Sequence, residues 1–511
     1  QMVITAAGEL EPLGQGTTVA DAAGETVTYD GQSIEMPQLV VDYTFKPLVW
    51  SDGTPVTAED SVYSFKVAAD RTTPSVNVET RYTAAYEATG ERSVRWTGLP
   101  GYLDPGFMTH VWTPLPSHQL GGFAAAELPE REEAARAPLS YGAFVVDSWT
   151  EGESIHLVPN PHYYRSAEGL PHLTSLTFRF LSSGNAALPE GYEGCHVLTS
   201  DTLSFDALAA LDEAASAGTL VEHIADAGVA EQIIFGIDST ADYADSHIDW
   251  FQDARVRQAL TLCTDRQAIV DELTGGRAAV MDTFVPNNHA LHPADLPQWG
   301  YDPEAGNALL DEAGFVDVTG DGIRDNIAPT VPFSVTLGTN AESPLRQQIN
   351  ERVAADLAQC GVQANLTTLP AGAWFAPGPS GAVFGRQFDL AEFAWLNRIE
   401  PNCGLYLTAN IPGSTQLGYN GWDGINVSGW SNEAYDAACN QALSLLPGQD
   451  GYAEAHQEAL RLFAQELPAM PLFTRLRLAA TTPDVLNFQL DPTQPSELWN
   501  VFEWDMPLGG S

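Results

Sequence analysis

Basic residues are scarce in this sequence. Its 511 residues include 67 acidic but only 22 basic side chains, which gives a formal net charge of −45. Only two of the bases are lysines, Lys46 and Lys66. Binding along a nucleic acid needs clustered positive charge, and an anionic membrane surface would repel so acidic a chain. Neither lysine follows a glycine, so the Gly-Lys-Ser/Thr of a nucleotide-binding P-loop is absent.

Long apolar stretches are also missing. No run of about 18 apolar residues occurs, so the sequence predicts no membrane-spanning helix. The chain opens Gln1-Met2-Val3-Ile4, without the charged and apolar regions of a signal peptide. Either the protein is cytosolic or an export signal has been removed.

The five cysteines form no recognisable motif. None belongs to a CxxC pair or flanks a histidine at the spacing of zinc ligands; they are Cys195, Cys263, Cys360, Cys403 and Cys439. Their number fits one or two disulfides plus a free buried thiol. Cysteine usage therefore leaves the compartment open.

Motifs of catalysis are lacking as well. HExxH and GxSxG do not occur, and no GxGxxG follows a strand pattern. The 11 histidines are scattered singly, and His118, His223 and His456 fit surface or capping roles better than metal ligation. Two of the many acids could form a glycosidase pair, which a sequence cannot place in space.

Large hydrophobic cores are within reach of this chain, because 44% of its residues are apolar and 10% aromatic. Its length predicts two to four domains. Strand patterns occur in the first 50 residues, and apolar periodicity predicts helices and strands beyond them. The expected helices are 57–69, 255–273, 306–313, 344–360, 433–445 and 452–467, and the expected strands 143–146, 154–158, 176–180, 331–337 and 362–369. This mixture predicts an α/β protein of two lobes, each on a mixed sheet.

Residues 317–325 match part of a calcium loop. Asp317, Asp321, Gly322 and Asp325 fit positions one, five, six and nine. Position three is Thr319 instead of an acid or asparagine, and position twelve carries no glutamate. A tight polar turn explains the segment more simply, so we expect no metal or other cofactor.

The segment 395–430 mixes aromatic and polar residues with few aliphatic ones. Such a mixture suits a ligand cavity, where apolar walls bury the ligand and a few polar groups orient it. The other interpretation is a small core beneath long loops. The pattern indicates binding more than catalysis.

Several ordered segments together resemble one known family. They are WSDGTPVTAEDSVYSF at 50–65, GAFVV at 142–146 with Trp149, NPHYY at 160–164, DARVRQAL at 253–260, LLDEAGF at 309–315 and SGWSNEAYD at 428–436. The set resembles the bacterial extracellular solute-binding proteins of family 5, the peptide-binding components of ABC importers. The resemblance extends over about residues 45–510.

The resemblance implies a two-lobed periplasmic-binding-protein-like fold of type II, in its large family-5 variant. Mixed sheets, a hinge and a central cleft that encloses the ligand belong to that fold. We expect lobe I at 1–234 plus 475–511 and lobe II at 235–474, with crossings near Ile234 and Thr474. The 49 residues before Trp50 are fewer than the family has, so we expect an N-terminal part that is trimmed or divergent.

The resemblance also implies ligand-binding residues. Peptide binders of the family often place an aspartate after a tryptophan, at the position of Trp395, to pair with the ligand's amino group. Here Arg398 occupies or neighbours that site and would clamp a carboxylate instead, while Glu400 or Asp423 would hold the amine. The full expected set is Trp395, Asn397, Arg398, Glu400, Trp422, Asp423 and Asn426, the last as a donor to the ligand backbone, with Trp112 from lobe I.

The implied function is non-enzymatic capture. The protein would bind peptides outside the cytoplasm, in the periplasm or on the outer face of the membrane, lipid-anchored before trimming. It would work as a monomer and deliver its ligand to an ABC transporter permease. An oligosaccharide-binding relative and a secreted acidic hydrolase are the alternatives.

An extracytoplasmic compartment permits disulfides. The resemblance leads us to expect a bridge between Cys403, beside the ligand segment, and Cys439. Cys263 lies on one face of an amphipathic helix, and we expect it to be a buried thiol.

Overall fold

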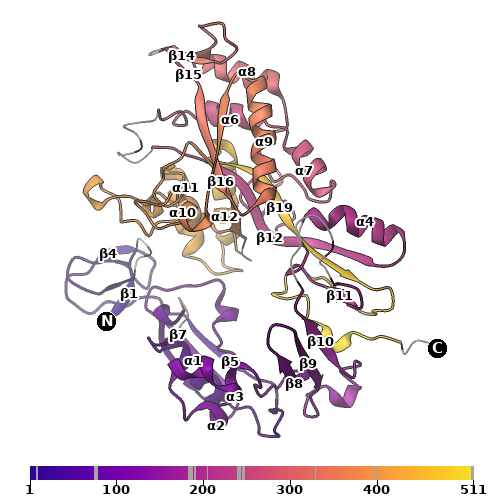
Figure 1. The fold of residues 1–511 in the computed structure, drawn as a ribbon. Coiled ribbons are helices and arrows are strands. Elements are labelled where there is room, and N and C mark those ends of the chain that lie inside the picture. The colour runs from indigo at the N-terminus through magenta and orange to yellow at the C-terminus, as the bar shows by residue number, and fades with distance from the viewer. Residues whose placement is uncertain are drawn as a thin grey trace. The chain divides into compact units, whose positions relative to one another are not determined.

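The computed structural model describes residues 1–507, apart from 7, 9, 74–78, 182–187, 189, 190, 204, 239–242, 244–247, 328, 329, 398 and 399 (Figure 1). The chain forms two compact units. Unit 1 comprises Gln1–His223 and Leu478–Ser511, and unit 2 comprises Ile224–Arg477. Both divisions fall inside long strands, β12 (Val221–Phe235) and β19 (Ala469–Thr481). The exact lobe boundaries and crossings expected from the sequence stay predictions.

Unit 1 is built on small antiparallel sheets. Its strands are β1 (Met2–Ile4) with β2 (Leu10–Pro12), β3 (Thr18–Ala20) with β4 (Thr26–Thr28), β5 (Val40–Thr44) and β6 (Thr83–Ala88) on either side of β7 (Ser93–Gly98), and β8 (Phe144–Thr150) and β10 (Leu176–Arg179) on either side of β9 (Ser154–Pro159). Its α-helices are α1 (Ala58–Ala69), α2 (Ser117–Leu120), α3 (Glu132–Ala135) and α4 (Leu208–Ser216). β11 (Val197–Leu198) pairs with the last residues of β19.

The sequence motif at 50–65 contains the residues that begin helix α1 and hold it in place. Asp60 is buried, and its carboxylate accepts the Thr57 N–H at 2.9 Å and the Trp50 Nε1–H at 3.3 Å. Its other oxygen accepts the N–H of Ser117 at 3.0 Å and the Ser117 hydroxyl at 2.6 Å. A carboxylate in the first turn also interacts favourably with the helix dipole. The predicted helix from Thr57 is therefore confirmed, and this motif fastens the helix within unit 1.

Unit 2 contains a mixed sheet in the order β19-β12-β18-β16-β17. β18 (Leu390–Leu396) is antiparallel to β12, and β16 (Ser334–Asn340) is parallel to both β18 and β17 (Gln363–Leu369). β13 (Phe315–Val316), β14 (Asp325–Ile327) and β15 (Thr330–Pro332) form a separate small sheet. The α-helices of the unit are α6 (Ala254–Leu262), α7 (Arg266–Thr274), α8 (Pro303–Glu312), α9 (Pro344–Gln359), α10 (Ala371–Trp374), α11 (Glu433–Leu443) and α12 (Tyr452–Glu466). No described helix combines the length and the hydrophobicity needed to cross a bilayer.

One helix expected over 255–273 is two helices. α6 ends at Leu262, and α7 begins after Asp265, whose carboxylate accepts the Ala268 N–H at 2.9 Å. The N–H of Asp265 is itself bonded to Asp356 at 3.0 Å. A capping aspartate satisfies a free N–H at a helix start, so the chain breaks here although its apolar periodicity continues.

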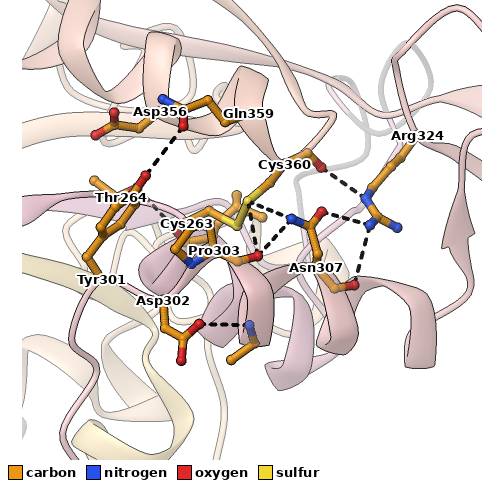
Figure 2. Close-up of a disulfide and its surroundings, with 12 residues drawn as sticks. Cys263, Thr264, Tyr301, Asp302, Pro303, Asn307, Arg324, Asp356, Gln359 and Cys360 are labelled. Atoms are coloured by element: carbon orange, nitrogen blue, oxygen red, sulfur yellow. Dashed lines mark hydrogen bonds between the residues drawn. A yellow bond between two sulfur atoms is a disulfide. The ribbon is translucent and has the colours of Figure 1, made fainter.

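The end of α6 is cross-linked to the end of α9. Cys263 and Cys360 form a disulfide with an S–S distance of 2.05 Å, and both residues are almost fully buried. The expectation of a free thiol at Cys263 was therefore wrong. Figure 2 shows Asn307 and Arg324 beside the bridge; the Asn307 amide nitrogen lies 3.6 Å from the Cys360 sulfur, and Arg324 Nε–H donates to the Cys360 carbonyl at 2.9 Å.

Helix α8 packs against this disulfide through a glycine. A Cβ atom added at Gly306 would lie 2.6 Å from the Cys263 sulfur and 3.0 Å from the Ala259 carbonyl oxygen. We therefore expect Gly306→Ala to lower the free energy of unfolding by about 1–2 kcal/mol, since the cost of overpacking exceeds the gain in helix propensity. Urea unfolding measures this loss. Gly372→Ala is the matched control, because Gly372 lies in helix α10 with open space around its Cα; an equal loss in both variants would contradict the packing argument.

The segment at 317–325 is a hydrogen-bonded turn. The carboxylate of Asp317 accepts the N–H groups of Gly320 at 2.6 Å and Gly322 at 3.0 Å. Asp325 accepts the N–H groups of Val318 and Thr319 at 3.0 and 3.2 Å. These carboxylates bind the backbone of their own loop, so the turn accounts for the acids. Among the described residues, no cluster of three or more His, Cys, Asp or Glu side chains could hold a metal ion.

Candidate ligand-binding surface

The first expected site residues lie at the end of strand β18. Trp395 pairs with Ala230 of β12, and its half-buried ring packs against Phe393 at 5.4 Å and Phe384 at 6.4 Å between centroids. The strand pairing continues one residue further, because the Asn397 N–H donates to the Gly228 carbonyl at 2.7 Å. Pairing with β12 therefore fixes the backbone of Trp395 and Asn397.

Glu400 lies close to a buried histidine. The carboxylate of Glu400 is 3.9 Å from Nε2 of His456 on α12, and His456 is 1% exposed. Burial lowers the pKa of His456 to about 4, because the charged ring would lose its hydration, and His289 lowers it further. The imidazole is therefore neutral near pH 7. Arg398, between Asn397 and Glu400 in the chain, lies outside the described residues.

Asn426 does not have the expected role of a donor to the ligand backbone. It is fully buried, and its side-chain amide donates both hydrogens, to the Leu407 carbonyl at 3.0 Å and the Trp430 carbonyl at 2.9 Å. Its side-chain oxygen accepts the Ser428 hydroxyl at 2.7 Å. The side chain has no donor left for a ligand. Asn426 instead stabilises the loop 407–430 by bonding to its backbone.

A disulfide holds the segment 395–430 near its beginning, at Cys403. Cys403 and Cys439 are bonded at 2.05 Å, the pair that the resemblance implied. Cys439 belongs to α11, and Tyr435 of that helix donates its hydroxyl to the Cys403 carbonyl at 2.8 Å. The backbone that leads from Glu400 into the loop is therefore fixed against α11.

Two of the expected tryptophans pack against the loop 375–389, which joins α10 to β18. Trp395 packs against Phe384, and the ring of Trp422 lies on Gly378, where an added Cβ would come within 2.2 Å of the ring. Arg386 holds this loop: its buried guanidinium donates to the Ile237 carbonyl at 2.8 Å and to the Pro412 carbonyl at 3.4 Å. Asp423, next to Trp422, is exposed. The loop therefore supports both aromatic rings of the expected surface.

Trp112 lies in unit 1. Its half-buried ring makes edge contacts with Phe65 at 4.7 Å and Tyr86 at 4.8 Å between centroids. These side chains belong to the apolar cluster around Trp96. Core packing accounts for this residue, and its role in ligand binding stays a prediction.

Sequence reasoning missed a cluster of four charged residues in unit 2, three of them buried. Glu231 of β12 and Glu392 of β18 are both fully buried. Arg346 of α9 lies 3.3 Å from Glu231 and 3.6 Å from Glu392, and Arg475 of β19 bonds to Glu231. Burial and the neighbouring Glu231 raise the pKa of Glu392 well above its usual range. The sequence signal was one acid inside each of two mainly apolar runs, 229–235 in β12 and 390–396 in β18.

The sequence pattern of the bacterial extracellular solute-binding proteins, family 5, middle region, matches residues 33–410. The oligopeptide-binding protein AppA of Bacillus subtilis is 24% identical over 90% of this chain and 79% of its own length.

Solved structures share the fold. AppA of Bacillus subtilis, in complex with a nonapeptide, has a TM-score of 0.63 at 23% identity, over 96% of this chain and 92% of that one. NikA of Brucella suis, in complex with Fe(III)-EDTA, has a TM-score of 0.69 at 17% identity, over 96% of this chain and 90% of that one. One architecture therefore holds chemically different ligands in different proteins.

Proposed function

Because this chain belongs to the bacterial extracellular solute-binding proteins of family 5, we propose that it captures peptides and delivers them to the permease of an ABC importer. The match to an oligopeptide-binding protein over 90% of the chain carries this proposal. The fold alone does not choose the ligand, since a relative with the same architecture is solved with an iron chelate.

The proposed binding residues in unit 2 are Trp395, Asn397, Arg398, Glu400, Trp422 and Asp423. The two tryptophans would supply apolar contact to peptide side chains. Glu400 or Asp423 would hold the amino group, and Arg398 the carboxylate. We further propose that the protein is a monomer without catalytic activity and that it acts outside the cytoplasm, lipid-anchored before trimming.

Mass spectrometry of ligands carried through purification tests the proposal. The protein is first weighed under native conditions, and its ligand is then released by denaturation. A ladder of peptide masses supports peptide capture and gives the length range. A hexose ladder would move the assignment to an oligosaccharide. If the protein is empty, melting temperatures are measured with peptide and oligosaccharide libraries, and a shift with peptides alone supports the proposal.

Arg398→Ala should weaken peptide binding by at least about tenfold, because truncating one partner of a desolvated charge pair costs about 2–5 kcal/mol. The melting temperature should change little. Calorimetric titration with a peptide that has been identified as above measures the affinity. Arg461→Ala is the control, since Arg461 pairs with an exposed Asp295 on the surface of unit 2. An unchanged affinity for Arg398→Ala would remove this residue from the site.

A further inference from the structure

Unit 1 contains an apolar cavity of about 540 Å³. Its walls come from distant parts of the chain: the segment after β5, the loop into β8, strands β9 and β10, and the C-terminal residues 498–502. Ala143, Phe144 and Tyr163 belong to a buried core cluster, and they also line the cavity. The cavity is thus an opening at the edge of that core, within the 300–1,000 Å³ typical of small-molecule sites.

The ionisable side chains that line this cavity are Lys46 and three tyrosines, and each of them can donate a hydrogen bond. Lys46 lines it, with its ammonium nitrogen 5.1 Å from the centre of the Tyr164 ring. Burial raises the pKa of Tyr163 to about 12, which keeps its hydroxyl protonated. None of the described residues that line the cavity is acidic.

This composition is unusual in so acidic a chain. With 67 acids and two lysines, the chain places one of those lysines, and no lining carboxylate, at an aromatic cavity. With a net charge of −45, the protein as a whole repels an approaching anion. The apolar walls offer contact to a hydrocarbon chain, and Lys46 lies exposed beside them.

We propose that this cavity binds an amphipathic carboxylate, of the class of medium-chain fatty acids. The hydrocarbon lies against Phe144, Leu157 and Phe178, and the carboxylate faces Lys46. The site lies in unit 1, whereas Trp395 and the residues after it lie in unit 2. If this proposal fails, the proposal of peptide capture still stands. If peptide capture fails, the fatty-acid site in unit 1 can still be tested by itself.

Calorimetric titration of the whole protein with decanoate tests the proposal, with decanol and acetate as probes of the two halves of the ligand. We expect saturable binding of decanoate, weaker binding of decanol and none of acetate. Lys46→Gln should weaken decanoate about fivefold and leave decanol unchanged, as an exposed charge pair contributes up to about 1 kcal/mol. Lys66→Gln, which removes the other lysine from the exposed side of α1, should change neither affinity.

A second pair of variants locates the site. Phe178→Glu puts a carboxylate into the cavity and should abolish decanoate binding, whereas Phe180→Glu, two residues further on at an exposed position, should not. Unchanged melting temperatures show that both variants fold. Absence of saturable decanoate binding, or binding that neither Lys46→Gln nor Phe178→Glu weakens, would overturn the proposal.

Discussion

Replacing Cys263 and Cys360 together by alanine should lower the free energy of unfolding of unit 2 by about 5 kcal/mol. The bridge joins residues 97 positions apart, and a cross-link that closes a loop of this length removes much of the conformational entropy of the unfolded chain. Urea unfolding measures the loss, and hydrogen exchange of peptides from α6 and α9 assigns it to unit 2. Opening of the double-alanine variant should begin at these two helix ends.

The other cysteines provide the controls. The Cys403–Cys439 bridge spans only 36 positions, so its removal should cost about 1 kcal/mol less by the same entropy relation. Cys195 forms no disulfide and is half-buried, and Cys195→Ala should change stability by less than about 0.5 kcal/mol. If the Cys263 and Cys360 variant lost less than about 1 kcal/mol, restriction of the unfolded chain could not be the source of stability.

Replacing Arg346 by methionine should lower the free energy of unfolding by about 3–5 kcal/mol. Breaking a buried ion pair leaves an uncompensated charge in a medium that solvates it poorly. Arg346 neighbours both Glu231 and Glu392, and neither glutamate is exposed. Arg475 still pairs with Glu231 in the variant, whereas Glu392 loses its cation. Arg461→Met, which removes an exposed pair, should cost less than about 1 kcal/mol.

The pH dependence of this loss has a definite sign. The pKa of Glu392 is raised in the folded protein, so its contribution to stability is present below the unfolded value of 4.5 and falls as pH rises through the folded pKa. Arg346 holds that pKa down, and its removal raises it further. The variant should therefore differ least from the parent near pH 4–5 and most near pH 8. Adding Glu392→Gln should restore part of the stability; a loss independent of pH would contradict a charge effect.

Local patterns predicted local structure well. The helix from Thr57 to Ala69 forms because its capping threonine and first-turn acids act within a few residues, and the strand pair of β8 and β9 follows its turn. The ordered motifs identified the family because each lies in a short segment. Trp395 and Trp422 were predicted to contact ligand because aromatic and polar residues alternate in one stretch of chain, and that role stays a prediction.

Features made by distant residues could not be predicted. The face of α6 indicated that Cys263 is buried, but nothing local indicated Cys360 as its partner. Asn426 was expected to bind ligand because it lies in the aromatic and polar segment 395–430; only the structure shows that two carbonyls take both of its donors. The cluster around Glu231 draws on three strands and a helix.

The division of the chain has a consequence for the order in which the two units can be completed during synthesis. Unit 2 is one continuous stretch, and both of its disulfides close once residue 439 has emerged. Unit 1 must wait for its last 34 residues, Leu478–Ser511. Ala479, Phe488 and Trp504 from that stretch cover Leu173 and Val197. Until Leu478–Trp504 have been synthesised, Leu173 and Val197 lack this cover, so a nascent chain stalled before Leu478 should be bound by chaperones through this part of unit 1.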